Sequence, residues 1–141
     1  MNKAISSLHK FLGLFVLLFV MIYTTACEKE AYILFNKYPF SEESMSATTN
    51  VFKPGEKIYY LVTTPKTVKT KRLLLQVMKM GKDERLGYET VWGKQVKVRD
   101  EQVFYYTDYF VFHSAGAYEM RAYSKDEPTK LLTTNYFYIR N

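Results

Sequence analysis

The chain is predicted to fold as an all-β antiparallel sandwich of about seven strands. β-Branched and aromatic residues cluster in short runs separated by turn residues, and no long stretch repeats apolar residues at helical spacing. The 13 tyrosines and 10 phenylalanines can supply an aromatic core, which the chain needs because it has only one cysteine. About seven strands in roughly a hundred residues is typical of a two-sheet sandwich.

The clearest strands are predicted at Lys57–Thr63 and Arg72–Met80. The first follows the turn Lys53–Glu56, and apolar residues alternate along both runs. Residues two apart in a strand share a face, so one side of each strand is expected to face the core. The inward positions are expected to be Ile58, Tyr60, Val62, Leu73, Leu75 and Val77.

The other strands are less sharply bounded. A turn at Gly81–Glu84 predicts a hairpin whose return strand is Arg85–Trp92. Further strands are expected at Gln102–His113, Ala117–Ser124 and Leu131–Arg140. The first strand is left open between Ala31–Phe35 and Ser46–Phe52.

The strand predicted at Gln102–His113 is aromatic on both faces. Phe104, Tyr106, Phe110 and Phe112 would share one face, while Tyr105, Tyr109 and Val111 would share the other. One face must join the core. The second is either covered by another strand or is an aromatic patch for a protein or sugar partner, and we expect it to be covered because a chain this short has little else to complete its core.

Residues 1–26 are predicted to be a helical signal peptide. Lys3 and Lys10 precede the apolar run Phe11–Tyr23 without an intervening acid. Thirteen helical residues span only ~20 Å, which is short of the ~30 Å hydrocarbon core of a membrane. The expected domains are therefore the signal peptide, a segment 27–45 that is tether or first strand, and a sandwich over 46–141.

The sequence Thr24-Thr25-Ala26-Cys27 lies where such a signal is cut. It resembles the lipobox of bacterial lipoproteins, in which a small residue precedes a cysteine that becomes lipidated. The resemblance implies that Cys27 carries palmitate or related acyl chains and anchors the protein in a membrane. Thr24 replaces the usual aliphatic residue, which leaves open cleavage after Ala26 by ordinary signal peptidase.

The segment Gly116-Ala117-Tyr118 resembles the tyrosine corner of immunoglobulin-like domains. In that corner a glycine permits the tight turn, and the tyrosine hydrogen-bonds back to the loop. Met120 stands where antibody-type domains have a cysteine, so no inter-sheet disulfide is implied. The resemblance extends to the broader immunoglobulin-like β-sandwich.

The number and sign of the charged residues limit the kinds of partner that the sequence predicts. After residue 26 the chain keeps 18 basic and 14 acidic residues, a net charge of +4, which is too mixed to indicate nucleic-acid binding. Basic residues are concentrated in the segment 65–72. This segment is a candidate contact for an anionic surface, although a solvated loop is the commoner interpretation. Its cations are Lys66, Lys69, Lys71 and Arg72.

No catalytic or metal-binding pattern is evident in the sequence. His113 and Ser114 are adjacent and would point to opposite faces of a strand, so with Asp108 they do not predict a triad. One histidine after the signal and one cysteine are too few for a zinc site, and the glycines form no phosphate-binding loop. We expect no enzyme activity, no metal and no cofactor.

The sequence therefore favours a non-enzymatic binding or structural module, anchored to the bacterial cell envelope through Cys27. Because Glu28 replaces the aspartate that retains some lipoproteins at the inner membrane, the outer membrane is favoured. The expected partners are the membrane and an envelope protein or glycan. The alternative is a freely diffusing periplasmic or secreted inhibitor or chaperone-like protein. The tether would reach ~14 Å if Ala31 opens the sandwich and ~65 Å if Ser46 does.

Overall fold

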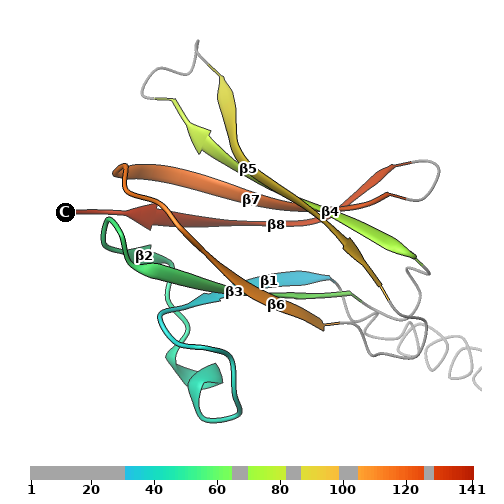
Figure 1. Ribbon diagram of the computed structural model, residues 1–141, viewed down its shortest axis with the longest axis horizontal. Helices are drawn as coiled ribbons and strands as arrows, with labels where there is room; N and C mark the ends of the chain where they lie inside the picture. The colour runs from blue at the N-terminus through green and yellow to red at the C-terminus, as the bar shows by residue number, and fades with distance from the viewer. Residues whose placement is uncertain (1–30, 65–69, 82–86, 99–104, 126–128) are drawn as a thin grey trace, which may run out of the picture.

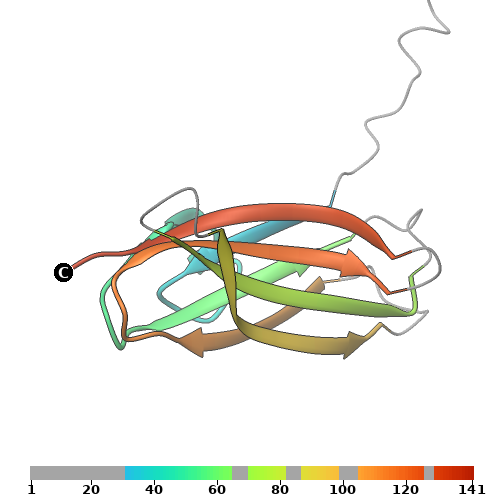
Figure 2. The same cartoon turned by 90° about the horizontal axis from the view of Figure 1, so that it is seen from above.

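A computed structural model describes residues 31–64, 70–81, 87–98, 105–125 and 129–141 of the 141-residue chain. Cys27, Lys66 and Lys69 lie outside the described residues, as does the predicted signal peptide. Within the described part, the chain forms two packed β-sheets whose strands run along the long axis of the molecule (Figure 1, Figure 2). The predicted β-sandwich is confirmed.

Across the described ranges the sandwich contains eight strands, one more than the approximate count that the sequence predicts. The three-stranded sheet has the order β1-β3-β6, and the five-stranded sheet has the order β2-β8-β7-β4-β5. A short 3-10 helix, η1, covers Ser44–Ala47. The strand bounds are β1 Tyr32–Asn36, β2 Val51–Phe52, β3 Lys57–Thr63, β4 Arg72–Met80, β5 Tyr88–Lys97, β6 Tyr105–Val111, β7 Gly116–Ser124 and β8 Lys130–Ile139.

This strand order matches an immunoglobulin-like sandwich. The first, third and sixth strands pair in one sheet, and the last two strands pair with β4 and β5 in the other. The pairing is not wholly antiparallel, because β2 runs parallel to β8, with Val51 opposite Tyr138. The expectation of a purely antiparallel sandwich was wrong at this point, since the chain crosses between the sheets after β1 and enters beside the C-terminal strand.

Both segments proposed for the first strand contribute to the fold. Tyr32–Asn36 pairs along its whole length with β3, and its Ile33 and Phe35 are buried in the core. Only Val51–Phe52 of the later segment is a strand. The sandwich therefore begins at Tyr32 and not at Ser46, because two core side chains lie upstream of the predicted boundary.

The strands β3 and β4 have the predicted bounds, and all six predicted inward side chains are buried. The strand β5 runs on to Lys97, five residues beyond the predicted end at Trp92. Gly93 indicates a turn in the sequence, yet it pairs with Gln76 inside the β4–β5 ladder. Gly93 lies beside the irregularity of this ladder at Val77 and Met78, which is a place where a strand glycine is common.

Phe137 of β8 occupies the centre of the core. Its ring lies 5.0 Å from Phe35 and 5.5 Å from Phe110 of the three-stranded sheet, measured between centroids. It also stacks on Tyr118 of β7 at 5.1 Å. Aromatic pairs at these separations contribute about 0.5–1.5 kcal/mol each beyond the burial of their area. One side chain thus joins the two sheets without a disulfide.

Asn135 closes one side of the sandwich. The backbone N–H groups of Tyr138 and Arg140 donate to β2 and its flank, at Asn50 and Phe52. The strand β2 is too short to reach the next N–H group on this side of β8, which belongs to Tyr136. This N–H donates instead to the side-chain oxygen of Asn135 at 2.8 Å. The amide nitrogen of Asn135 donates at 2.8 Å to the carbonyl of Ile33 in β1. One side chain therefore substitutes for the missing backbone pairing.

The substitution Phe137→Ala is expected to lower the free energy of unfolding by about 3–5 kcal/mol, because it leaves a cavity at the contact between the sheets. Chemical denaturation of the mature protein measures this. Tyr136→Ala, one position along β8 and exposed, is the matched control and should change stability by about 0.5 kcal/mol or less. Equal losses for the two variants would contradict the central role of Phe137.

Candidate interaction surfaces

The predicted corner residue Tyr118 lies at the start of β7 and is fully buried. Its hydroxyl donates a 2.5 Å hydrogen bond to the carbonyl of Ser114 in the preceding turn, and Phe112 stacks on its ring at 5.2 Å. Gly116 has φ of +152°, and a Cβ there would come within 3.0 Å of the Lys79 side chain. This is the geometry of a tyrosine corner, and the positive φ of Gly116 favours glycine at the turn.

Tyrosine and phenylalanine are segregated between the surface and the interior of the sandwich. No described phenylalanine is exposed, whereas seven tyrosines are. A phenol ring is apolar on its faces and polar at its hydroxyl, which makes it stable in water and effective at contacts with partners. The exposed tyrosines are Tyr32, Tyr38, Tyr88, Tyr105, Tyr109, Tyr136 and Tyr138.

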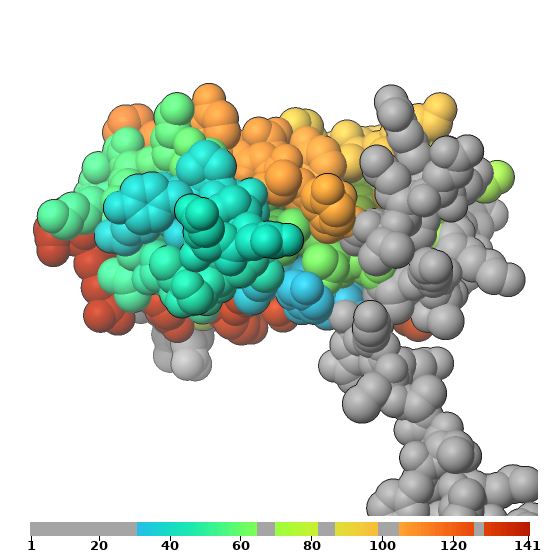
Figure 3. Space-filling view, turned by 90° about the horizontal axis from the view of Figure 1, so that it is seen from below, coloured from blue at the N-terminus to red at the C-terminus, as the bar shows by residue number. Residues whose placement is uncertain are grey.

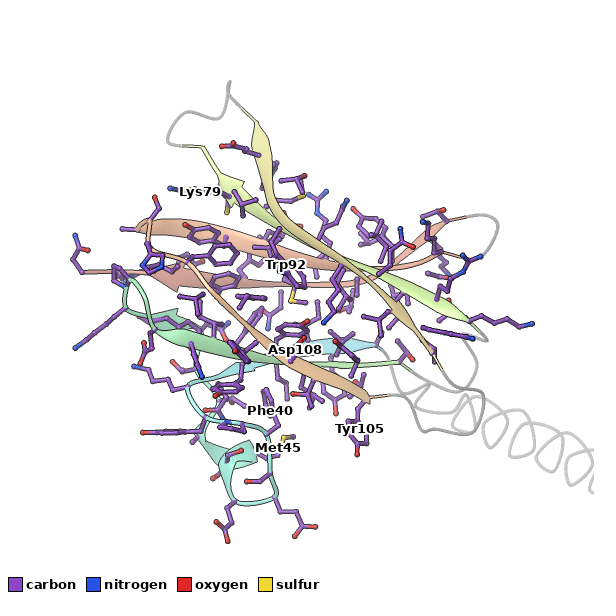
Figure 4. All side chains as sticks on the ribbon, in the orientation of Figure 1. Phe40, Met45, Lys79, Trp92, Tyr105 and Asp108 are labelled. Carbon is purple, nitrogen blue, oxygen red and sulfur yellow. The ribbon has the colours of Figure 1, made fainter. Side chains whose placement is uncertain are left out.

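The outer surface of the β1-β3-β6 sheet, here called the three-strand face, presents one group of these rings. Tyr59 lies opposite Tyr109 in the β3–β6 ladder, with ring centroids 5.5 Å apart. Tyr32 and Tyr105 flank Thr63 in the last row of the same sheet. Tyr105 is 68% exposed and projects from the end of the sandwich (Figure 4).

The expected covering of the second face of β6 was wrong for most of that strand. The segment 37–50 lies across part of the three-strand face, and β6 stays open beside it (Figure 3). Leu61, an outward residue of β3, is only 7% exposed, while Tyr105 and Tyr109 of β6 are exposed. The segment is held by its own hydrogen bonds, including one from the Asn36 amide to the Ser44 carbonyl at 2.7 Å. An irregular crossover, and not a strand, is what partly completes this side.

The outer surface of the five-stranded sheet, here called the five-strand face, carries an ion pair that sequence reasoning missed. Arg121 binds both carboxylate oxygens of Glu119, at 2.8 and 3.0 Å. Glu119 is only 3% exposed, and the guanidinium lies 5.3 Å from the Tyr88 ring centroid. Hydrogen bonding to Glu119 raises the pKa of Arg121. Opposite charges two residues apart in a predicted strand were the available signal, since such residues share a face.

A second polar cluster closes the other side of the sandwich, between β5 and β6 (Figure 4). The Lys94 ammonium donates to the Asp108 carboxylate at 2.6 Å, and the Tyr106 hydroxyl donates to the same oxygen at 3.2 Å. The hydrogen bond from Lys94 lowers the pKa of Asp108, and the bond to Asp108 raises that of Lys94. Asp108 also accepts the backbone N–H of Tyr109 at 2.9 Å.

The three residues considered for a catalytic triad have separate partners. Asp108 binds Lys94, and the Ser114 hydroxyl accepts a hydrogen bond from Lys79. His113 is exposed, and its ring lies so close to Gly55 that a Cβ on that glycine would be 3.4 Å from Nδ1. The structure thus assigns each of these side chains to a turn or an edge contact.

Of the predicted basic contact group, Lys71 and Arg72 are described and exposed, where β4 begins. No group of three or more potential metal ligands is found within the described ranges. Over the same part of the chain, no helix has the length and apolar character needed to cross a membrane.

The class of protein that these observations define is an immunoglobulin-like β-sandwich with tyrosine-rich outer faces. No family model matches the chain, and no curated protein does. Among solved structures, the chain is similar to the PmoD soluble domain from Methylocystis sp. (Rockwell), with a TM-score of 0.50 and 8% sequence identity. The match covers 78% of this chain and 90% of that one. At this identity the likeness shows the fold alone.

Acidification is expected to weaken the fold partly through Asp108. Because its folded pKa is lowered, its contribution is fully present above its unfolded value of about 3.9 and is lost as the pH falls through the folded value. Unfolding of the wild type and of Asp108→Asn, compared between about pH 5 and about pH 2, should show a smaller loss for the variant. The difference should not exceed about 1 kcal/mol, because the pair with Lys94 is partly exposed. Glu43→Gln is the control, and an equal effect there would contradict the assignment.

The variant Tyr118→Phe is expected to lower the free energy of unfolding by about 0.5–1.5 kcal/mol, because it removes the hydrogen bond to Ser114 and keeps the ring stack. Denaturant unfolding of the mature protein measures the change. Tyr138→Phe, which removes an exposed hydroxyl from β8, should leave stability unchanged. A Tyr118→Phe variant as stable as the wild type would mean that the corner bond contributes nothing.

Proposed function

We propose that the chain is a bacterial envelope lipoprotein, in which acylated Cys27 holds a non-enzymatic β-sandwich at the membrane and the sandwich binds a partner. The single observation that carries the binding role is the exposure of seven tyrosines on a domain whose described phenylalanines are all buried or only partly exposed. β-Propensity accounts for tyrosine in strands, but it does not account for leaving the rings in water.

The contact with the partner is made by a face of the sandwich and not by added strands. Strand edges invite pairing through their free N–H groups, but on β6 the Tyr109 N–H is bonded to Asp108. On β5 the register shifts beside Val77, which disturbs the ladder near the other exposed edge. The tyrosine-bearing faces lack such obstacles, and an envelope protein or glycan fits their mixed apolar and hydroxyl character.

The anchor sets the location of the protein. Cys27 follows a signal-like apolar segment, and the acyl chains implied by the lipobox resemblance would hold the domain at the envelope. The outer membrane is the favoured site in a cell that has two membranes. The competing function is a freely diffusing inhibitor or chaperone-like protein, for which the same sandwich would be cut after Ala26 and released.

Mass spectrometry of the mature protein tests the anchor. The N-terminal residue is expected to be Cys27 with two or three acyl chains, and Cys27→Ser should move the protein from the membrane to the soluble fraction. Thr25→Ser, a small-for-small change beside the cleavage site, should leave it in the membrane. An unmodified amine on Cys27 in the native protein would favour the diffusing alternative.

Photo-crosslinking in the native envelope tests the binding face. A photoreactive amino acid in place of Tyr109 on the three-strand face, or of Tyr136 on the five-strand face, should crosslink one defined envelope component from one of these faces. His113, exposed in a turn between β6 and β7, is the control position. Equal diffuse labelling from all three positions would argue against a dedicated face.

A further inference from the structure

We infer that one end of the sandwich is a docking surface for anionic lipid head groups, and that it orients the domain upright on its membrane. This basic end is where β1 begins, opposite the C-terminus (Figure 1). The inference rests on the proposed lipid anchor and goes beyond it, because an anchor alone does not fix which part of the domain meets the bilayer. The described residues of the basic end are Ala31, Tyr32, Thr63, Thr64, Thr70–Arg72, Lys97, Val98, Tyr105, Ser124, Lys125 and Thr129–Leu131.

Strand register gathers cations at this end from separate parts of the chain. Arg72 lies opposite Lys97 in the β4–β5 ladder, and Lys130 lies opposite Ser124 in the β7–β8 ladder. The backbone N–H of Lys125 donates to the Arg72 carbonyl at 2.9 Å, which joins the two ladders. With Lys71, five cations share the end, and no described residue there is acidic.

The connections at the basic end do not cancel this charge. By sequence, residues 28–30, 65–69, 99–104 and 126–128 add four cations and six acids, so five plus four minus six leaves a net charge of +3. Cations held near an anionic leaflet are attracted to it within about one Debye length, ~10 Å at moderate salt. The charge is thus complementary to an anionic membrane and not to a zwitterionic one.

Amphipathic side chains accompany the cations. Tyr32 and Tyr105 border this end on the three-strand face, and Leu131 of β8 is also exposed there. Tyrosine favours the interface between head groups and hydrocarbon, where the ring meets apolar atoms and the hydroxyl stays hydrated. Tyr105 is 68% exposed, so most of this residue is available for such a contact.

The chain upstream of β1 is too short to hold the domain away from the bilayer. Cys27 precedes Tyr32 by five residues, a reach of about 18 Å at most when fully extended. The basic end is therefore the part of the sandwich nearest the lipid, and the opposite end carries the C-terminus outward. A membrane is favoured over a soluble anion, because the attachment point and the cations coincide.

Fluorescence quenching on vesicles tests the orientation in the full acylated protein. A dye on Thr129→Cys at the basic end, or on Lys53→Cys at the opposite end, is exposed to quenchers carried by lipid head groups. In phosphatidylethanolamine–phosphatidylglycerol vesicles, quenching is expected at Thr129→Cys and not at Lys53→Cys. It should weaken in phosphatidylcholine vesicles and in high salt.

Two triple variants with the same net charge isolate the role of the basic end. With the dye at Thr129→Cys, Arg72→Gln/Lys97→Gln/Lys130→Gln should abolish the dependence on lipid charge. Lys53→Gln/Lys57→Gln/Arg140→Gln, at the opposite end, should preserve it. Equal quenching at both ends, no effect of lipid charge, or equal loss in both triple variants would overturn the inference. An unacylated Cys27 with no vesicle binding would instead refute the proposed anchor.

Discussion

The structure depends on packing aromatic rings between two sheets that no disulfide joins. Phe137 reaches from β8 to Phe35 and Phe110 on the opposite sheet, while Tyr118 stacks on it from its own sheet. A disulfide at this place would tolerate loose packing around it, but a ring cluster does not, because dispersion contacts fall off within a fraction of an ångström. The pairing of the strands must therefore keep the register that aligns these rings. The same register fixes which side chains lie on the two outer faces.

The need to pack rings tightly between the sheets explains why phenylalanine and tyrosine occupy different places in the domain. The core takes phenylalanine and two fully buried tyrosines. The Tyr118 hydroxyl donates to Ser114, whereas the Tyr60 hydroxyl is buried without a hydrogen-bond partner among the described residues. Six of the seven exposed tyrosines lie in strands, at positions that alternate with core side chains, so the period of two that builds the core also builds a phenolic surface. The same alternation of residues along the strands therefore determines both the core and the candidate recognition surface.

Strong alternation made β3 and β4 predictable to the residue, and the tyrosine corner was recognisable because its glycine and tyrosine are local in the sequence. The course of β5 through Gly93 was not, since glycine is depleted in strands and the pairing with β4 that holds it there cannot be seen in the sequence. The crossover 37–50 was missed for a different reason: its stability comes from short polar contacts such as Asn36 with Ser44, which have no periodic signature. The pair Glu119–Arg121 was visible as a spacing, but its burial depends on neighbours from other strands.

Asn135 and Asp108 have the same role on opposite sides of the sandwich. Each accepts the N–H of the following residue, and each also contacts another strand, through Ile33 or Lys94. Unsatisfied strand edges can pair with another copy of the same chain and favour fibre-like polymerisation. By occupying these N–H groups internally, the two side chains leave fewer sites at which one copy of the domain could pair with another.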